Sequence, residues 1–294
     1  MSASTIPIKT KTPKPVAVKA SSGTVPPHVA WLTNTGNKVL TSDKKAIELW
    51  EFKHTPDSTV LSAWAKHFRN QYCRDDEIDS LRSGTGLSRK DYLRTVVFPD
   101  PVVAPGPSIR AGDFAEVLVA DYLEYLLKFW VPRPRYDNRV VRNTSTPGTD
   151  ILGFRMSDKS GVPSPKDVLA IYEVKAQFTG TKLLARLQDA VDGSAKDVIR
   201  KSETLNAIKR RLIEKKLALE ARKVERFQNQ VDRPYREEFG AAACLSSNLV
   251  DHDQLRLTKC AHHPFRKHLK LVVMSGSLLM DLVSKLFDVA ANES

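Results

Sequence analysis

The amino-acid sequence predicts an α/β protein in which a mixed central sheet is flanked by helices. The segment VLAIYEVKAQF, residues 168–178, has apolar residues on both faces of a strand, as expected in the middle of a sheet. Long helical patterns precede and follow this strand, over residues 110–130 and 183–230. Two further apolar segments, residues 239–247 and 269–275, predict additional strands. Such alternation of helices and strands is typical of α/β domains.

The composition is ordinary for a globular protein, but its charge balance is strongly basic. Of the 294 residues, 41% are hydrophobic and 27% are charged, which suffices for a sizeable core. The formal net charge of +12 favours a polyanionic partner, chiefly nucleic acid, although ribosomal, membrane-surface and merely soluble proteins can share it. No apolar run approaches the ~18 residues of a membrane-spanning helix, so we expect no membrane partner. The three cysteines lack CxxC spacing, which fits a reducing cytoplasm and gives no zinc motif.

Three regions are expected along the chain. Residues 1–27 predict a disordered basic arm, which is either a solvated tail or a contact for nucleic acid. Residues 28–108 predict an N-terminal helical region that ends in a Pro-rich linker, and residues 109–294 predict the α/β domain. The helical expectation rests on one face formed by Ala46, Leu49, Trp50 and Phe52, on a second helix capped by Ser58, and on a third after Ser88.

The α/β domain is expected to begin with the helix over residues 110–130, with Asp113 as its N-cap. Strands are predicted over residues 139–142 and 150–155, and a polar hairpin loop then leads into the strand 168–178. Two or three helices, divided near Asp192 and Gly193, should fill residues 183–230. The last helix is expected to turn these residues inwards: Leu278, Leu279, Leu282, Leu286 and Phe287.

A pair of opposite charges interrupts the apolar strand 168–178. Glu173 and Lys175 lie on one face together with Gln177, because strand residues alternate between faces. Asp150 begins the neighbouring strand of the hairpin and can lie beside Glu173, and Glu116 on the preceding helix can approach if that helix packs on the sheet. Carboxylates brought together repel one another unless a cation lies between them, so the pattern indicates a Mg²⁺ or Mn²⁺ site. A neighbouring lysine can stabilise charge on a phosphate under attack.

Each of these residues also has a structural interpretation. Glu116 follows Asp113 by three residues and could close a capping box. Asp150 follows Pro147 and Gly148 and could be a turn aspartate, while Glu173 and Lys175 could form a structural ion pair. Gln177 is more typical of a peripheral position than of a catalytic one.

The residues GTD at 148–150 and EVK at 173–175, with Glu116 upstream on a helix, resemble the PD-(D/E)XK nuclease superfamily. The resemblance implies a restriction-endonuclease-like core and a divalent metal held by Asp150, Glu173, the Val174 carbonyl and Glu116. It further implies that Lys175 positions the attacking water. Gln177 would bind either metal-bound water or a DNA phosphate.

Three longer segments carry a narrower resemblance: GDFAEVLVADYL, GTDILGF and YEVKAQF are similar to the nuclease (HamA-like) subunit of Hachiman-type antiphage systems. This resemblance implies a subunit that works beside a helicase subunit. Together with the metal site, it predicts a metal-dependent nuclease whose substrate is DNA rather than RNA. The helicase partner would dock on the N-terminal region.

Contacts to nucleic-acid phosphates are expected from basic residues near the candidate site, namely Arg135, Arg139, Arg142, Lys209 and Arg210. The alternative is that these side chains are solvated or braced by nearby glutamates. Two other functions remain open from the sequence: a catalytically silent nucleic-acid-binding or adaptor subunit of the same fold, and a basic RNA-binding protein.

Overall fold

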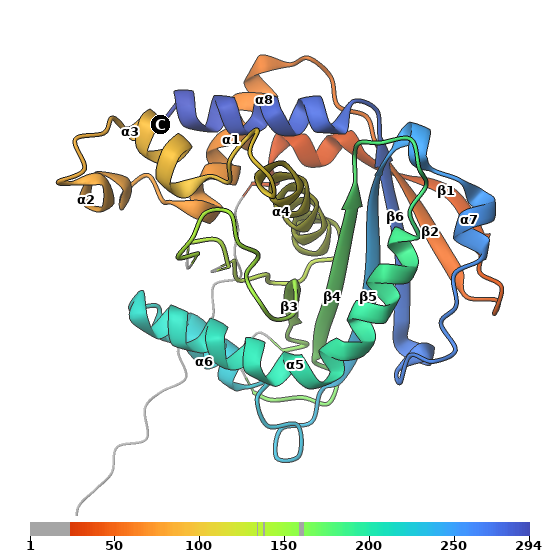
Figure 1. Ribbon diagram of the computed structural model, residues 1–294. Coiled ribbons are helices and arrows are strands. Elements are labelled where there is room, and N and C mark those ends of the chain that lie inside the picture. The colour runs from red at the N-terminus through yellow and green to blue at the C-terminus, as the bar shows by residue number, and fades with distance from the viewer. Residues whose placement is uncertain (1–23, 134, 138, 159–161) are drawn as a thin grey trace, which may run out of the picture.

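The computed structural model describes residues 24–294 except 134, 138 and 159–161. The described residues form a six-stranded mixed sheet in the order β1-β2-β6-β5-β4-β3 (Figure 1). The strands are β1 (Leu32–Leu40), β2 (Ala46–Phe52), β3 (Ile151–Arg155), β4 (Val168–Gln177), β5 (Arg236–Ser246) and β6 (Leu269–Gly276). The hairpins β1–β2 and β3–β4 are antiparallel, and the four inner strands are parallel to one another. The predicted mixed α/β sheet is confirmed.

Helices cover both faces of this sheet. On one face pack α1 (Ser58–Tyr72), α4 (Gly106–Asp121) and α8 (Leu279–Asn292), around a core that includes Trp64, Phe68, Phe114 and Phe287. On the other face lie α5 (Arg186–Glu214) and α6 (Ala218–Glu225), around Val191, Leu205 and Phe227. The shorter helices are α2 (Ile78–Arg82), α3 (Arg89–Tyr92) and α7 (His252–Arg256).

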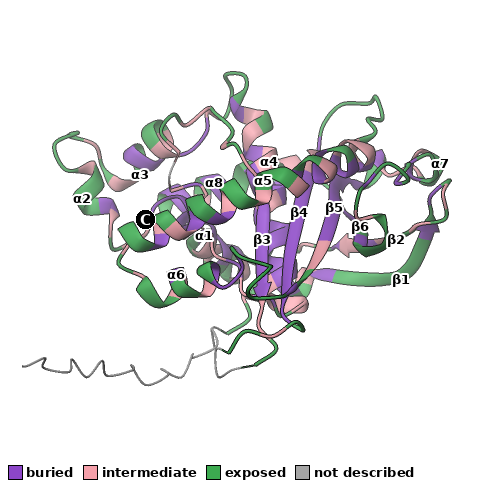
Figure 2. Cartoon of the chain, turned by 90° about the horizontal axis from the view of Figure 1, so that it is seen from below, coloured by how far each residue is buried: buried purple, intermediate pink, exposed green. Residues whose placement is uncertain are grey.

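β4 is the strand on which both cores meet. Leu169 and Ile171 pack in the core beneath α5, whereas Ala170, Tyr172 and Val174 pack in the core beneath α4. Figure 2 shows β3, β4 and β5 buried, in contrast to β1 at the opposite edge, which is largely exposed. The expectation of a central strand with two apolar faces is therefore confirmed, and it places Glu173 on the α5 side.

The expected helix around residues 45–52 is wrong. This segment is β2, which pairs with β1 and, in parallel, with β6. Ile47 and Leu49 pack in one core and Phe52 in the other, so the segment satisfies both faces of a sheet. The sheet thus takes strands from both sides of the Pro-rich segment. Of the predicted arm, residues 1–27, the first 23 lie outside the described residues. Pro27 begins a short helical turn that ends at Trp31.

The helices near the candidate site also differ from expectation. α4 begins at Gly106, so Asp113 lies within the helix and is not its cap. α5 runs unbroken through Asp192 and Gly193, and the chain breaks instead at residues 215–217, where Lys216 has a positive φ. Residues 139–142 form no strand, and Val140 is exposed. Two predictions farther from the site are also wrong. Asp57, and not Ser58, caps α1, and Leu278 precedes α8 and is exposed.

A search of the described part of the chain found no helix with the length and apolar character needed to cross a membrane.

Candidate active site

The hairpin β3–β4 brings Asp150 to Glu173, as the sequence predicts. Ile151 pairs with Tyr172 in the antiparallel register, which places Asp150, the residue before β3, at the level of Glu173. The Asp150 Oδ2 accepts a hydrogen bond of 2.9 Å from the backbone N–H of Val174. This bond fixes one carboxylate oxygen of Asp150 at the β4 backbone and leaves the other turned towards the neighbouring side chains.

Glu173 is held between Lys175 and helix α5. The Lys175 ammonium donates to Glu173 Oε1, and a Cβ atom on Gly193 of α5 would lie 2.6 Å from that same oxygen. Only glycine therefore lets α5 pack this close to the Glu173 carboxylate. Glu173 is 5% exposed and its Oε2 is buried without a hydrogen-bond partner. Burial and the nearby charge of Asp150 raise the pKa of Glu173, while Lys175 opposes the rise.

Asp150, Glu173 and the predicted Glu116 form a cluster that we call the acidic centre. The structure adds a fourth acidic residue, Asp197 of α5, which was missed from the sequence. Its side chain is fully buried, Oδ1 accepts a 3.1 Å hydrogen bond from the Thr149 hydroxyl, and Oδ2 has no partner. Burial, followed by the charges of Glu173 and Asp150, raises the pKa of Asp197 to about 8. Asp197 follows Gly193 by one helical turn, a spacing that puts both on one face. That signal was lost because the helix was expected to break there.

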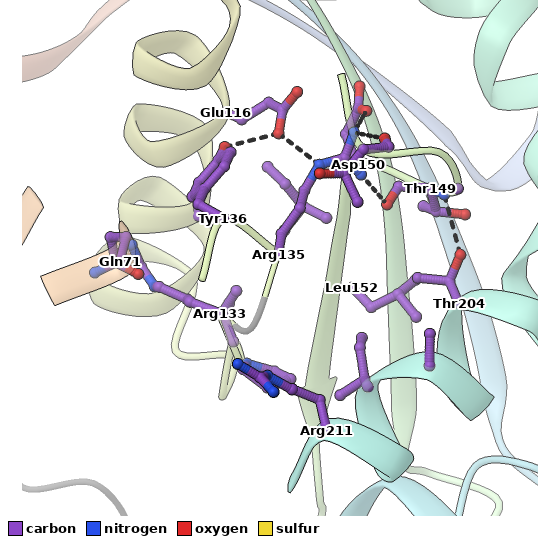
Figure 3. A pocket seen from close by; sticks show the side chains of 18 of the residues that line it. Gln71, Glu116, Arg133, Arg135, Tyr136, Thr149, Asp150, Leu152, Thr204 and Arg211 are labelled. Atoms are coloured by element: carbon purple, nitrogen blue, oxygen red, sulfur yellow. Dashed lines mark hydrogen bonds and ion pairs between the residues drawn. The ribbon is translucent and has the colours of Figure 1, made fainter. Parts of the chain in front are cut away.

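Glu116 reaches the centre from α4, on the other side of the sheet. Its Oε2 accepts a hydrogen bond from the Tyr136 hydroxyl at 2.7 Å and forms an ion pair with the Arg135 Nε at 3.0 Å. Burial raises the pKa of Glu116 to about 8, and the Arg135 charge opposes this rise. The capping-box interpretation is wrong, because Glu116 lies well inside α4. Arg135 also donates from Nη2 to Asp150 Oδ1 at 2.9 Å, so it bridges the two carboxylates (Figure 3).

The basic residues predicted to contact phosphates fall into two groups, arginines that are paired with aspartates near the site and basic residues on α5. Arg139 is buried in a two-pronged ion pair with Asp113, and Arg142 pairs with Asp100. On α5, Arg210 is exposed and pairs with Glu214, whereas Lys209 is half-buried and pairs with Glu225.

The Gln177 side chain is hydrogen-bonded to the backbone of the segment that connects β4 to α5. Its amide nitrogen donates to the Lys182 carbonyl at 2.8 Å, and its amide oxygen accepts from the Leu184 N–H at 3.2 Å. Both ends of the side chain are therefore used by the backbone that follows β4.

The donor set suits a divalent cation that prefers oxygen. Asp150, Glu173, Asp197 and Glu116 supply carboxylates, and the two partnerless buried oxygens on Glu173 and Asp197 are unusual unless a cation or water meets them. Within the described ranges, no three acidic, His or Cys side chains are arranged to hold a metal as they stand. Arg135 and Lys175 instead neutralise part of the charge, so the residues fit a metal by chemistry and require side-chain movement to bind it.

A cavity of about 290 Å³ adjoins this centre, between α4, the segment 131–152 and α5 (Figure 3). Glu116, Arg135 and Asp150 form its charged end. Most of the remaining wall is apolar and includes Val117, Val131, Ile151, Leu152 and Ile208. The cavity therefore offers room beside the carboxylates for a side chain or for part of a substrate.

The fold and the site together define an α/β protein with four carboxylates and one lysine at the end of a central hairpin, and the carboxylates of Glu173 and Asp197 are buried. The family model HamA matches residues 27–290, and the chain belongs to the HamA family. The resemblance to the HamA-like subunit of Hachiman-type systems is thereby confirmed, and membership suggests a role in antiphage defence. A comparison with curated proteins found no match to this chain.

The raised pKa of Asp197 predicts a pH-dependent stability. An unfolded aspartate has its pKa near 3.8 and the folded Asp197 near 8, so the native state binds more protons between these values. The contribution of Asp197 to the free energy of unfolding should therefore fall as pH rises from 4 to 8. Asp197→Asn removes this penalty, and the variant should gain about 1 kcal/mol or more over the parent at pH 8 relative to pH 5.

Urea unfolding with EDTA present measures this difference, and Asp192→Asn on the exposed face of the same helix is the control. Equal effects of Asp197→Asn at both pH values would contradict the assignment of a buried, charge-repelled carboxylate.

Proposed function

We propose that this protein is a nuclease that uses Mg²⁺ or Mn²⁺ to hydrolyse phosphodiester bonds, most readily those of DNA. The observation that carries the proposal is the convergence of Asp150, Glu173 and Asp197, two of them with partnerless buried oxygens, next to the Lys175 ammonium. Mutual repulsion of this kind is costly in a fold and is common where a cation and a phosphate are to be bound. The basic balance of the chain supports a nucleic-acid substrate.

The residues divide the chemistry between them. Asp150 and Glu173 would hold the cation, with Glu116, Asp197 and the Val174 carbonyl available to complete its surroundings. The cation, when bound, supplies positive charge beside the scissile phosphate and acidifies a nearby water. The Lys175 ammonium orients the attacking water and stabilises the charge that grows on the phosphate oxygens. The water oxygen forms the new P–O bond while the bond to the leaving sugar oxygen breaks.

The substrate backbone would lie along the basic residues of α5, among them the exposed Arg210 and the half-buried Lys209. Contacts of this kind bind phosphates without reading sequence. Arg139, Arg142 and Gln177 are not included, because the first two are paired with Asp113 and Asp100 and the third is bound by backbone. Arg135 is held by Glu116 and Asp150 in this structure and does not lie free for a phosphate. A helicase partner remains a prediction that follows from the sequence resemblance alone.

The nuclease proposal predicts that Asp150→Ala and Lys175→Ala lose plasmid cleavage. The expected loss is about 10²-fold or more for each variant, because each removes a group that acts on the reacting phosphate. The assay is conversion of supercoiled plasmid to nicked or linear forms with Mg²⁺ or Mn²⁺. Lys166→Ala, at an exposed lysine in the loop between β3 and β4, is the matched control and should cut like the parent.

Two outcomes would contradict the proposal in different ways. If Asp150→Ala and Lys175→Ala cut like the parent, the site is wrongly assigned. If the parent binds DNA and does not cut it with either metal, the chain is better described as a silent nucleic-acid-binding subunit of this fold.

The α5 surface is tested by the double variant Lys209→Ala/Arg210→Ala. Loss of two phosphate contacts should weaken binding of unrelated DNA sequences equally and lower the slope of log affinity against log salt by about 2. Fluorescence anisotropy at several salt concentrations measures both quantities. The control Lys66→Ala/Lys285→Ala removes the same charge from exposed positions on α1 and α8. An equal loss in both double variants would show only a general charge effect.

A further inference from the structure

The guanidinium of Arg135 bridges two carboxylates of the acidic centre, those of Glu116 on α4 and Asp150 before β3. Its Nε forms an ion pair with Glu116 Oε2 at 3.0 Å, and its Nη2 donates a hydrogen bond to Asp150 Oδ1 at 2.9 Å. Two backbone carbonyls complete the set, those of Thr149 and Thr146, each at 2.8 Å. The side chain is 14% exposed. Arg135 is thus the internal counter-ion of two carboxylates that come from different elements.

A guanidinium and a divalent cation cannot share this position. Mg²⁺ is bound at about 2.0–2.1 Å from its oxygen ligands, whereas the Arg135 nitrogens already stand between the same oxygens at hydrogen-bond distance. Both species are attracted by the same negative charge. Binding of the cation to Glu116 and Asp150 therefore requires Arg135 to leave.

The structure provides a place for the displaced side chain. Arg135 lines the cavity of about 290 Å³ that lies next to the centre, together with Glu116 and Asp150. A turn of the side chain into this space would free Asp150 Oδ1 and would leave the Tyr136 hydroxyl as the remaining donor to Glu116 Oε2. The planar fork of an arginine also matches the paired oxygens of a phosphate diester, so the released group would meet a nucleic-acid backbone in suitable form.

We propose that Arg135 competes with the divalent cation for Glu116 and Asp150, and that the cation binds when Arg135 moves into the cavity. This proposal rests on the proposed function. Lys175 does not share this role, because the carboxylate that it contacts is that of Glu173. Arg211 lines the same cavity and pairs with Asp137 and Glu214, away from the centre. If Arg135 had only a structural role, its removal would weaken cation binding, because the two carboxylates would become disordered. Competition predicts tighter binding instead.

The test measures Mn²⁺ binding to the full chain without nucleic acid, by the electron paramagnetic resonance signal of free Mn²⁺. Arg135→Gln should bind Mn²⁺ about tenfold or more tightly than the parent, because a competing charge in direct contact is removed. Arg211→Gln, with the same charge change in the same cavity, should stay within about twofold of the parent. Arg135→Lys keeps the charge, cannot form the forked bridge, and should lie between the parent and Arg135→Gln.

Unchanged or weaker Mn²⁺ binding by Arg135→Gln overturns the proposal, as does an equal gain in Arg211→Gln. If Arg135→Gln fails to fold, shown by loss of its cooperative thermal transition, Arg135→Lys decides: a gain supports competition and a loss overturns it. The result is separable from the nuclease test. Tighter binding that Asp150→Asn abolishes supports the proposal even if no DNA is cut. Lys175-dependent cutting with unchanged Mn²⁺ affinity would leave the nuclease function standing and this proposal refuted.

Discussion

The burial of neighbouring carboxylates is the constraint on which the structure of this site depends. Burial raises the pKa of both Glu173 and Asp197, and the charge of nearby carboxylates adds to the rise. A fold keeps such a group together only if compensating charge or hydrogen bonds are close by. Here compensation comes from the Lys175 ammonium, the Arg135 guanidinium, the Val174 N–H and the Thr149 hydroxyl. Two carboxylate oxygens are still left without partners, and these mark where a cation or a substrate water fits.

The surrounding architecture is arranged to hold these charges in place. The hairpin β3–β4 fixes Asp150 against the backbone of β4, and pairing with β3 on one side and β5 on the other makes β4 a rigid support. Helix α5 approaches Glu173 closely because Gly193 has no side chain, and this approach also delivers Asp197. Helix α4 brings Glu116 from the opposite face, where Arg135 ties it to Asp150. Membership in the HamA family agrees with the antiphage role that the sequence resemblance implies.

Local patterns predicted the centre of the fold well and its periphery less well. The strand 168–178 could be recognised because apolar residues on both faces of a short segment belong in a sheet interior, where the charges of Glu173 and Lys175 are costly. The segment 46–52 was mistaken for a helix because its apolar positions fit either period, and only pairing with β6, far along the chain, decides between them. Asp197 and the bridging role of Arg135 were also missed. Arg135 acts through neighbours that are distant in sequence, and no spacing rule connects it to them. The one-turn spacing of Gly193 and Asp197 was hidden because the helix was expected to break at Gly193.

The central claim is that this acidic centre binds a divalent cation, and a crystal structure of the protein soaked in Mn²⁺ tests it most directly. The expected result is an anomalous difference peak within about 2.0–2.4 Å of carboxylate oxygens of both Asp150 and Glu173, with the Arg135 side chain turned into the neighbouring cavity. A map with no peak at this position, and with Arg135 still bonded to Glu116 and Asp150, would contradict the account.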